Sequence, residues 1–270
     1  MTGARGVAGT FATAGDAGRA ALVGYLPAGF PDVDASIALI RGMIRGGCDV
    51  IEVGLPYSDP VMDGPTIQAA ADTALAAGTR ISDVFRVVEA AAEHVPTLVM
   101  TYWNPVERYG VERFAADLAQ AGGAGLITPD LVPDEGAEWI AAADAHELDK
   151  VFLVAPSSSE ARLRSTADAC RGFVYATAVM GVTGAREQSS SLAPELVNRA
   201  RQVTDKPIGV GLGVSNGTQA AEVAAFADGV IVGSAFVRAV DQAAARHEVD
   251  GVQAVTDLAA DLARGVRGEL

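Results

Sequence analysis

The chain has 270 residues, enough for one large α/β domain or two small ones, and 50% of them are hydrophobic while 20% are charged. This composition excludes a disordered chain, which would have too few apolar side chains to form a core. The net charge is −14 at pH 7 and the isoelectric point is about 4.5. Such an acidic chain is unsuited to nucleic acid or an anionic membrane surface, although backbone amides and helix termini can still bind a phosphate locally.

Cysteine and histidine usage predicts no metal site. Cys48 and Cys170 do not form a Cys-x-x-Cys pair, and the three histidines are far apart in the sequence. We interpret both cysteines as core residues of a chain in a reducing compartment. The N-terminus lacks the features of a signal peptide, and no apolar run reaches membrane-spanning length. A cytoplasmic location is expected.

Taken in order, the chain begins with a Gly- and Ala-rich segment, 1–18, which we expect to be a loose lead-in with at most one short helix. Apolar, strand-like runs then alternate with amphipathic helical segments. The predicted strands are 21–26, 49–53, 97–101, 125–127, 150–154, 173–176, 207–211 and 229–232. The predicted helices are 33–46, one beginning near residue 65, 111–121, 133–145, 159–169, 194–203, 216–225, 234–246 and 250–264.

Eight strand–helix units without a linker indicate a parallel sheet with right-handed crossovers. This number of units in a chain of this size predicts an α/β fold, a single-domain (β/α)8 TIM barrel over residues 1–270, with extra N-terminal and late helices. An open doubly wound sheet is the alternative. It is disfavoured because the first strand–helix turn, residues 26–32, lacks the G-x-G-x-x-G phosphate-binding motif.

A glutamate, Glu52, interrupts the second apolar strand. A carboxylate inside a buried strand is unfavourable unless it has a partner or a function. Strand alternation places Glu52 on the face opposite Ile51 and Val53, which would be the barrel interior near the carboxyl-terminal mouth, where barrel active sites lie. An apolar mouth would raise the pKa of Glu52 and let it exchange a proton near neutral pH. A glutamate turned to solvent at the strand end is the alternative.

A second carboxylate, Asp63, follows in the turn-rich segment before the next helix. Pro65 suits the first position of that helix, and either Asp63 or Thr66 could cap its amides. Two acids one loop apart could equally share acid–base chemistry on a small molecule. From the residues alone, capping and catalysis both remain open for Asp63.

Glycines follow each of the last three predicted strands. They lie in the segments 181–184 and 211–213 and at position 233, where Ser234 follows at a predicted helix start. Glycine lets the backbone approach a ligand closely, and a helix start offers amides to an anion. In barrels phosphate commonly binds near the last two strands, so these loops predict a phosphate site.

These segments together resemble the tryptophan synthase alpha chain family. Residues 51–60 read IEVGLPYSDP and residues 63–68 read DGPTIQ, which is a long and specific signature. The resemblance continues through 100–104, 181–184, 211–213 and 233–234, and covers nearly the whole chain from about residue 20. Departures include the Ser-rich loop 185–191 and two bulky or rigid residues beside the site, Trp103 and Pro129, which affect the shape of the pocket.

The resemblance implies a cofactor-free lyase that cleaves indole-3-glycerol phosphate to indole and glyceraldehyde 3-phosphate in a retro-aldol reaction. Glu52 matches the general acid–base that protonates the indole carbon, and Asp63 matches the carboxylate that stabilises charge on the indole nitrogen. The other matched residues are substrate contacts or contacts made when a loop closes. They are Tyr25, Met100 and Ile127 at the indole, Tyr175 near the glycerol phosphate chain, Gly184, Gly213, Gly233 and Ser234 at the phosphate, and Thr183, which would touch the aspartate.

The resemblance also implies a partner, a pyridoxal-phosphate-dependent beta chain in an αββα heterotetramer that receives indole through a tunnel. The loops 56–63 and 179–193 match those that close over the site and communicate with this partner. An alternative function is that of an allosteric, substrate-binding activator of the beta chain with feeble activity alone. Another phosphate-handling barrel enzyme, such as an isomerase, would explain the late glycines but not the segment containing Glu52 and Asp63.

Overall fold

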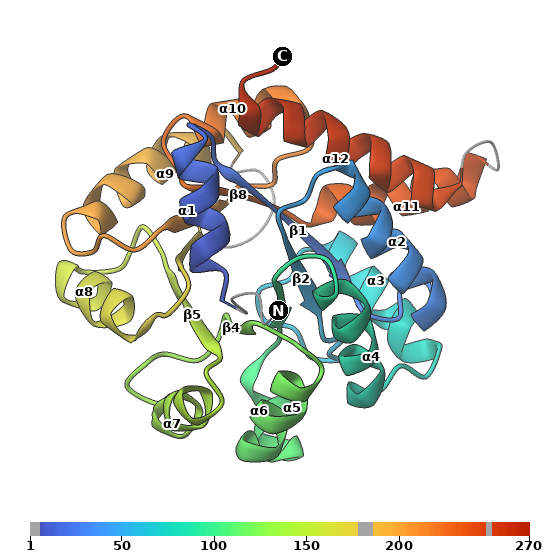
Figure 1. Ribbon diagram of the computed structural model, residues 1–270, viewed down its shortest axis with the longest axis horizontal. Helices are drawn as coiled ribbons and strands as arrows, with labels where there is room; N and C mark the ends of the chain where they lie inside the picture. Colours follow the sequence, from blue (N-terminus) through green and yellow to red (C-terminus); the bar gives the residue numbers. More distant parts are fainter. Residues whose placement is uncertain (1–5, 178–185, 247–249) are drawn as a thin grey trace.

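The computed structural model describes residues 6–177, 186–246 and 250–270, and in these ranges eight parallel strands close into a barrel in the order β1 to β8 (Figure 1). The strands are β1 (Ala21–Pro27), β2 (Val50–Gly54), β3 (Thr97–Met100), β4 (Gly125–Thr128), β5 (Asp149–Val154), β6 (Val174–Thr177), β7 (Ile208–Gly211) and β8 (Gly229–Val232). The predicted (β/α)8 barrel is confirmed.

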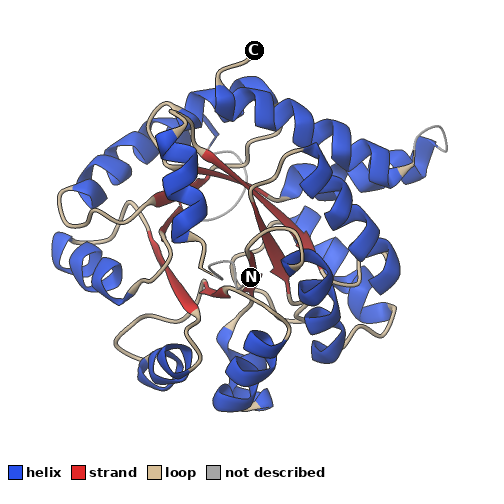
Figure 2. Ribbon diagram, viewed as in Figure 1, coloured by secondary structure: helices blue, strands red, loops and turns tan. Residues whose placement is uncertain are grey.

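Helices surround the strands on the outside of the barrel (Figure 2). They are α1 (Ala8–Asp16), α2 (Val33–Gly46), α3 (Pro65–Ala76), α4 (Ile81–Ala92), α5 (Trp103–Tyr109), α6 (Val111–Gln120), α7 (Ala137–Ala145), α8 (Glu160–Ala169), α9 (Arg186–Arg201), α10 (Gly217–Ala224), α11 (Ser234–Arg246) and α12 (Gly251–Arg267). Within the described ranges, none of these helices combines the length and the apolar character needed to cross a bilayer.

Four helical segments differ from the prediction, and one of them, α7, begins at Ala137 and not at Pro133. Helices α4 and α5 were not predicted, because we assigned a single helix to each crossover. Helix α9 begins at Arg186, well before Pro194, which lies inside the helix rather than at its first turn. A proline suits a helix start but does not define one, and the surrounding packing can place it further along.

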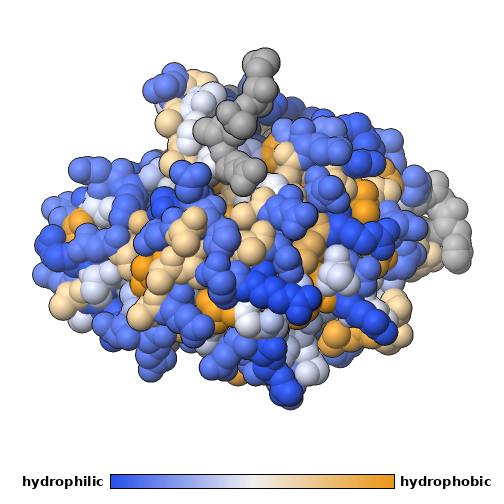
Figure 3. Space-filling model, turned by 60° about the horizontal axis from the view of Figure 1, so that its bottom comes forward, coloured by the Kyte–Doolittle hydropathy of each residue, from blue (hydrophilic) through white to orange (hydrophobic). Residues whose placement is uncertain are grey.

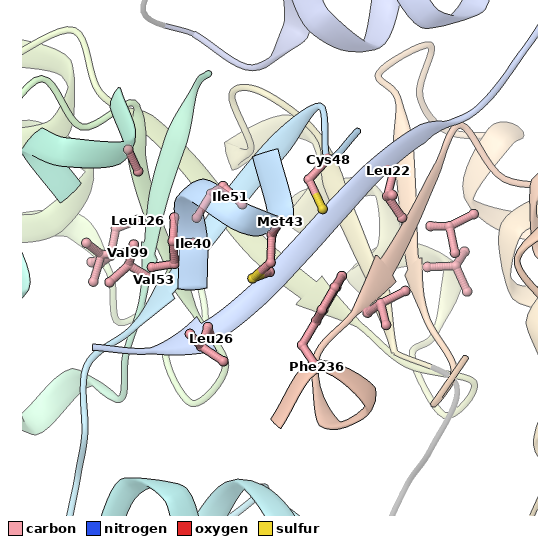
Figure 4. Close-up of a cluster of buried hydrophobic side chains, with 14 of the residues drawn as sticks. Leu22, Leu26, Ile40, Met43, Cys48, Ile51, Val53, Val99, Leu126 and Phe236 are labelled. Atoms are coloured by element: carbon pink, nitrogen blue, oxygen red, sulfur yellow. The ribbon is translucent and has the colours of Figure 1, made fainter. Parts of the chain in front are cut away.

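The apolar core has an outer and an inner part. The outer part lies between the strands and the helices, where Ile51 and Val53 of β2 face the side of α2 that carries Ile40 and Met43 (Figure 4). The inner part fills the barrel and includes Val50. Since side chains alternate along a strand, Glu52 shares the interior face with Val50, as predicted.

The short helix that we expected at most in the N-terminal segment is present as α1, but residues 7–16 are packed against the barrel and are not a loose lead-in. Helix α1 places Phe11 against Phe173 of the inner core, with ring centroids 5.0 Å apart, and Phe11 is 3% exposed. The amide of Val7 donates a hydrogen bond to Oδ2 of Asp149 at 2.8 Å. These contacts hold α1 across the amino-terminal end of the barrel, at the front of Figure 1.

The visible surface is mostly hydrophilic. Hydrophilic residues predominate on the face shown in Figure 3, and apolar residues form small patches between them. Such a mixture is ordinary for a folded protein, since apolar atoms always contribute a large share of the exposed area.

Candidate active site

A cavity of about 480 Å³ opens at the carboxyl-terminal end of the barrel. Strand ends and the β2–α3 loop contribute its walls, which is where the active sites of such barrels lie. The predicted site residues that line it are Tyr25, Glu52, Asp63, Met100, Tyr175, Gly213, Gly233 and Ser234. Ile127 belongs instead to the inner core of the barrel, and Thr183 and Gly184 lie outside the described residues.

Glu52 is fully buried at 0% exposure, so the alternative of a solvent-facing side chain is wrong. Its register partners are Tyr25 on β1 and Leu98 on β3. Neither carboxyl oxygen has a hydrogen-bond partner in the described part of the chain. Burial alone raises the pKa of Glu52 to about 8, because the ionised form loses its hydration. The group is therefore protonated at neutral pH and can donate its proton to a ligand in the cavity.

Asp63 occupies the β2–α3 loop at the edge of the same cavity. Burial raises its pKa, and a hydrogen bond with the Tyr102 hydroxyl opposes this by favouring the ionised form. Helix α3 begins at Pro65 after Gly64, and no side chain makes a capping hydrogen bond there. The capping alternative for Asp63 therefore does not hold in this structure.

Tyr102 joins two loops beside the cavity, a role that the sequence reasoning missed. Its hydroxyl accepts a hydrogen bond from the Met62 amide at 3.0 Å, next to Asp63. Its ring lies 5.5 Å from that of Tyr57, whose hydroxyl accepts from Asn104 Nδ2 at 2.8 Å. The β2–α3 loop is thus fastened to the end of β3. The segment 100–104 was recognised in the sequence, but the contact depends on barrel closure.

Two glycines make room for the aromatic walls of the cavity. A Cβ atom on Gly211 would lie 2.7 Å from the Tyr175 hydroxyl, and one on Gly54 would overlap with the Tyr25 hydroxyl. Burial is the first cause that raises the pKa of both tyrosines, and the Glu52 carboxylate adds to it. Both tyrosines therefore stay neutral, and their rings give the cavity walls suited to an aromatic ligand.

Another part of the cavity lining is made of backbone and small polar groups. Gly213 has a φ of +67°, which favours glycine, and a Cβ atom there would meet nothing within 4 Å. Gly233 follows β8, where a Cβ atom would lie 3.1 Å from the Tyr25 ring, and Ser234 begins α11. The first amides of a helix have no acceptor within the helix and carry its positive dipole end, so this part of the cavity suits an anion.

Arg238, one turn along α11, also lines the cavity and was not predicted from the sequence. Its spacing of four residues from Ser234 places both on one helix face, which is a signal that the sequence contains. In the described ranges, no three His, Cys, Asp or Glu side chains lie together as metal ligands would.

This fold and this cavity define the class of the protein as a (β/α)8-barrel enzyme with two carboxylates at its carboxyl-terminal mouth. The model of the family "Tryptophan synthase alpha chain" matches residues 11–267. The tryptophan synthase alpha chain of Mycobacteroides abscessus is 61% identical over 252 residues, covering 92% of both chains. That of Nocardia farcinica is 60% identical over 262 residues, covering 97% of this chain and 96% of the relative.

A solved structure of Mycobacterium tuberculosis tryptophan synthase gives a TM-score of 0.90 at 54% identity, covering 97% of this chain and 98% of the solved one. The chain belongs to the tryptophan synthase alpha chain family. As a member it is a carbon–carbon lyase of tryptophan biosynthesis that acts on indole-3-glycerol phosphate.

Proposed function

We propose that Glu52 and Asp63 carry out the retro-aldol cleavage of indole-3-glycerol phosphate in this cavity. The protonated carboxyl of Glu52 donates its proton to the indole carbon that bears the glycerol phosphate chain. The resulting positive charge lies on the ring nitrogen, where ionised Asp63 accepts the N–H and stabilises it. The hydroxyl on the glycerol phosphate chain of the substrate then returns a proton to Glu52 as the carbon–carbon bond breaks. The electron pair of this bond restores the aromatic indole ring, and an aldehyde forms on the departing fragment.

The single observation that carries this proposal is the fully buried, unpaired carboxyl of Glu52 at the cavity wall, with a pKa raised to about 8. Asp63 differs because it is only partly buried and its ionised form receives a hydrogen bond. Burial raises the pKa of both carboxyls, but only Asp63 receives a hydrogen bond that favours its ionised form, and this difference suits separate acid and electrostatic roles.

Indole release by the purified chain tests the assignment. Glu52→Gln keeps the shape of the side chain but cannot transfer the proton, and we expect its turnover to fall by roughly 10²–10⁴-fold, with substrate binding retained. Glu89→Gln, at an exposed position of α4, is the matched control and leaves turnover unchanged. The assignment is wrong if the Glu52 variant keeps most of the parent rate.

We also propose that the substrate phosphate binds at Gly213, Gly233 and Ser234, together with Gly184, which lies outside the described residues. The positive-φ turn at Gly213 and the amino-terminal end of α11 support this placement. A Ser234→Asp variant brings a negative charge to this end, and we expect its substrate affinity to fall at least tenfold. Equal affinity of the variant and the parent by calorimetric titration would contradict the placement.

We infer further that the chain works in the cytoplasm, in an αββα assembly with a pyridoxal-phosphate-dependent beta chain. Exposed apolar side chains on the loops around the mouth, Val61, Met62 and Val132, are suited to contact a partner. Sedimentation of a mixture of the two chains should give a complex of two alpha and two beta chains. Indole release measured with and without the beta chain separates a lyase from a substrate-binding activator, because an activator would release indole only feebly in both measurements.

A further inference from the structure

Arg238 is a cationic side chain in the wall of a cavity whose proposed substrate carries a phosphate. Among the residues that the structure describes, the lining includes two carboxylic acids, Glu52 and Asp63, and one cationic side chain, that of Arg238. The whole chain has a net charge of −14, so its overall field repels an anion. A local cation at the cavity therefore has a large share in attracting a phosphate.

The position of Arg238 directs its side chain toward the part of the cavity proposed to bind the phosphate. Helix α11 begins at Ser234, and Arg238 is four residues further along the same helix face. Side chains in a helix lean toward its amino terminus, so the guanidinium reaches back over the turn that carries Ser234. Helix α3 packs against α11, and its first residues line the same cavity.

Most other arginines of the described ranges form a hydrogen bond or an ion pair with another residue, and Arg238 does not. Arg19 forms a bidentate pair with Asp49, and Arg201 pairs with Asp228. Arg238 makes no hydrogen bond or ion pair with any residue of the described ranges, although its side chain is half-buried at the cavity. A guanidinium in this setting has its donors available for a planar, two-point contact with phosphate oxygens.

We propose that Arg238 is a phosphate-binding residue of the substrate site, whose guanidinium contacts the phosphate from the side opposite the amides of Gly233 and Ser234. This inference rests on the proposed placement of the phosphate. Arg238 is not among the groups that shift the pKa of Glu52 or Asp63, so we assign its contribution to substrate affinity and not to the chemical step.

Steady-state cleavage and inhibition by inorganic phosphate test this role. We expect Arg238→Met to raise both KM and the inhibition constant of inorganic phosphate about tenfold, with kcat within twofold of the parent. Arg238→Lys keeps the charge without the planar fork, so it should recover part of both losses. Indole, which has no phosphate, should bind the Met variant and the parent equally well.

The control is Arg164→Met, at an exposed position of α8, which changes the net charge by the same amount. It should alter neither constant. The proposal is overturned if Arg238→Met leaves KM and phosphate inhibition within twofold of the parent, or if Arg164→Met shows the same losses. If Ser234→Asp weakens binding while Arg238→Met does not, only the role of Arg238 fails. If neither variant weakens binding, the phosphate placement itself is wrong.

Discussion

Replacement of Glu52 by glutamine should stabilise the fold in a strongly pH-dependent way. Burial raises the pKa of Glu52 from its usual value of 4.5 to about 8, so between these values the folded chain binds a proton that the unfolded chain releases. The protonated carboxyl contributes fully to the free energy of unfolding below pH 4.5. This contribution is lost as the pH rises toward about 8. Glutamine has no such dependence.

The size of the effect follows from the two pKa values. Each pKa unit between the folded and unfolded states is worth about 1.4 kcal/mol. Between roughly pH 5 and pH 7.5, the free energy of unfolding of the parent should therefore fall by about 3 kcal/mol relative to that of Glu52→Gln. This is a large share of the total, because domains are typically stable by about 5–15 kcal/mol.

Urea unfolding of both proteins across this pH range measures the difference directly. Subtracting the two stability curves removes the contribution of every other titrating group, and Glu89→Gln shows how much an exposed Glu-to-Gln change contributes. A difference between Glu52→Gln and the parent that is the same at low and high pH would refute the reasoning. Glu52 would then be solvated or paired in solution, and its use as a proton donor at neutral pH would lose its physical basis.

Two further variants test the loop anchor and the N-terminal helix. Tyr102→Phe removes the hydrogen bond that lowers the pKa of Asp63, so the acidic limb of the kcat profile should move to higher pH and kcat should fall about tenfold at neutral pH. Tyr109→Phe, at the end of α5, removes a hydroxyl that donates to Asp117 and is the control, and equal profiles of Tyr102→Phe and the parent would contradict the anchor. Phe11→Ala should lower the free energy of unfolding by about 3–4 kcal/mol without changing kcat/KM, because α1 lies at the opposite end of the barrel. A loss below about 1 kcal/mol would mean that α1 is loosely held.

The features that the sequence predicts are local or periodic. Alternation of strand and helix signals is enough for the barrel, and the period of two along β2 is enough to place Glu52 inside it. The missed features depend on contacts between distant segments. Phe11 is buried by Phe173, and Tyr102 meets Asp63 only because β2 and β3 are neighbours in the closed barrel. No local pattern contains either contact.

The helix errors have a different cause. Helix α4 carries apolar residues at a helical spacing, with Val84, Val87, Val88 and Ala91 all buried, so its signal was present in the sequence. The assumption of one helix per strand obscured it. Helix α5 is a single short element of 7 residues after β3, too short for periodicity to distinguish it from a loop.

On the inner face of β2, two positions carry residues that serve the cavity and that pack less well than apolar side chains would. Val50 lies in the apolar interior of the barrel, but two residues later the same face carries Glu52, whose carboxyl has no partner in the described ranges. Gly54 comes next on that face, and its missing side chain leaves room for the Tyr25 hydroxyl. An apolar residue at position 52 would pack without the pH-dependent penalty of a buried acid. The strand therefore changes from a structural to a functional role within five residues, at the boundary between the core and the mouth of the barrel.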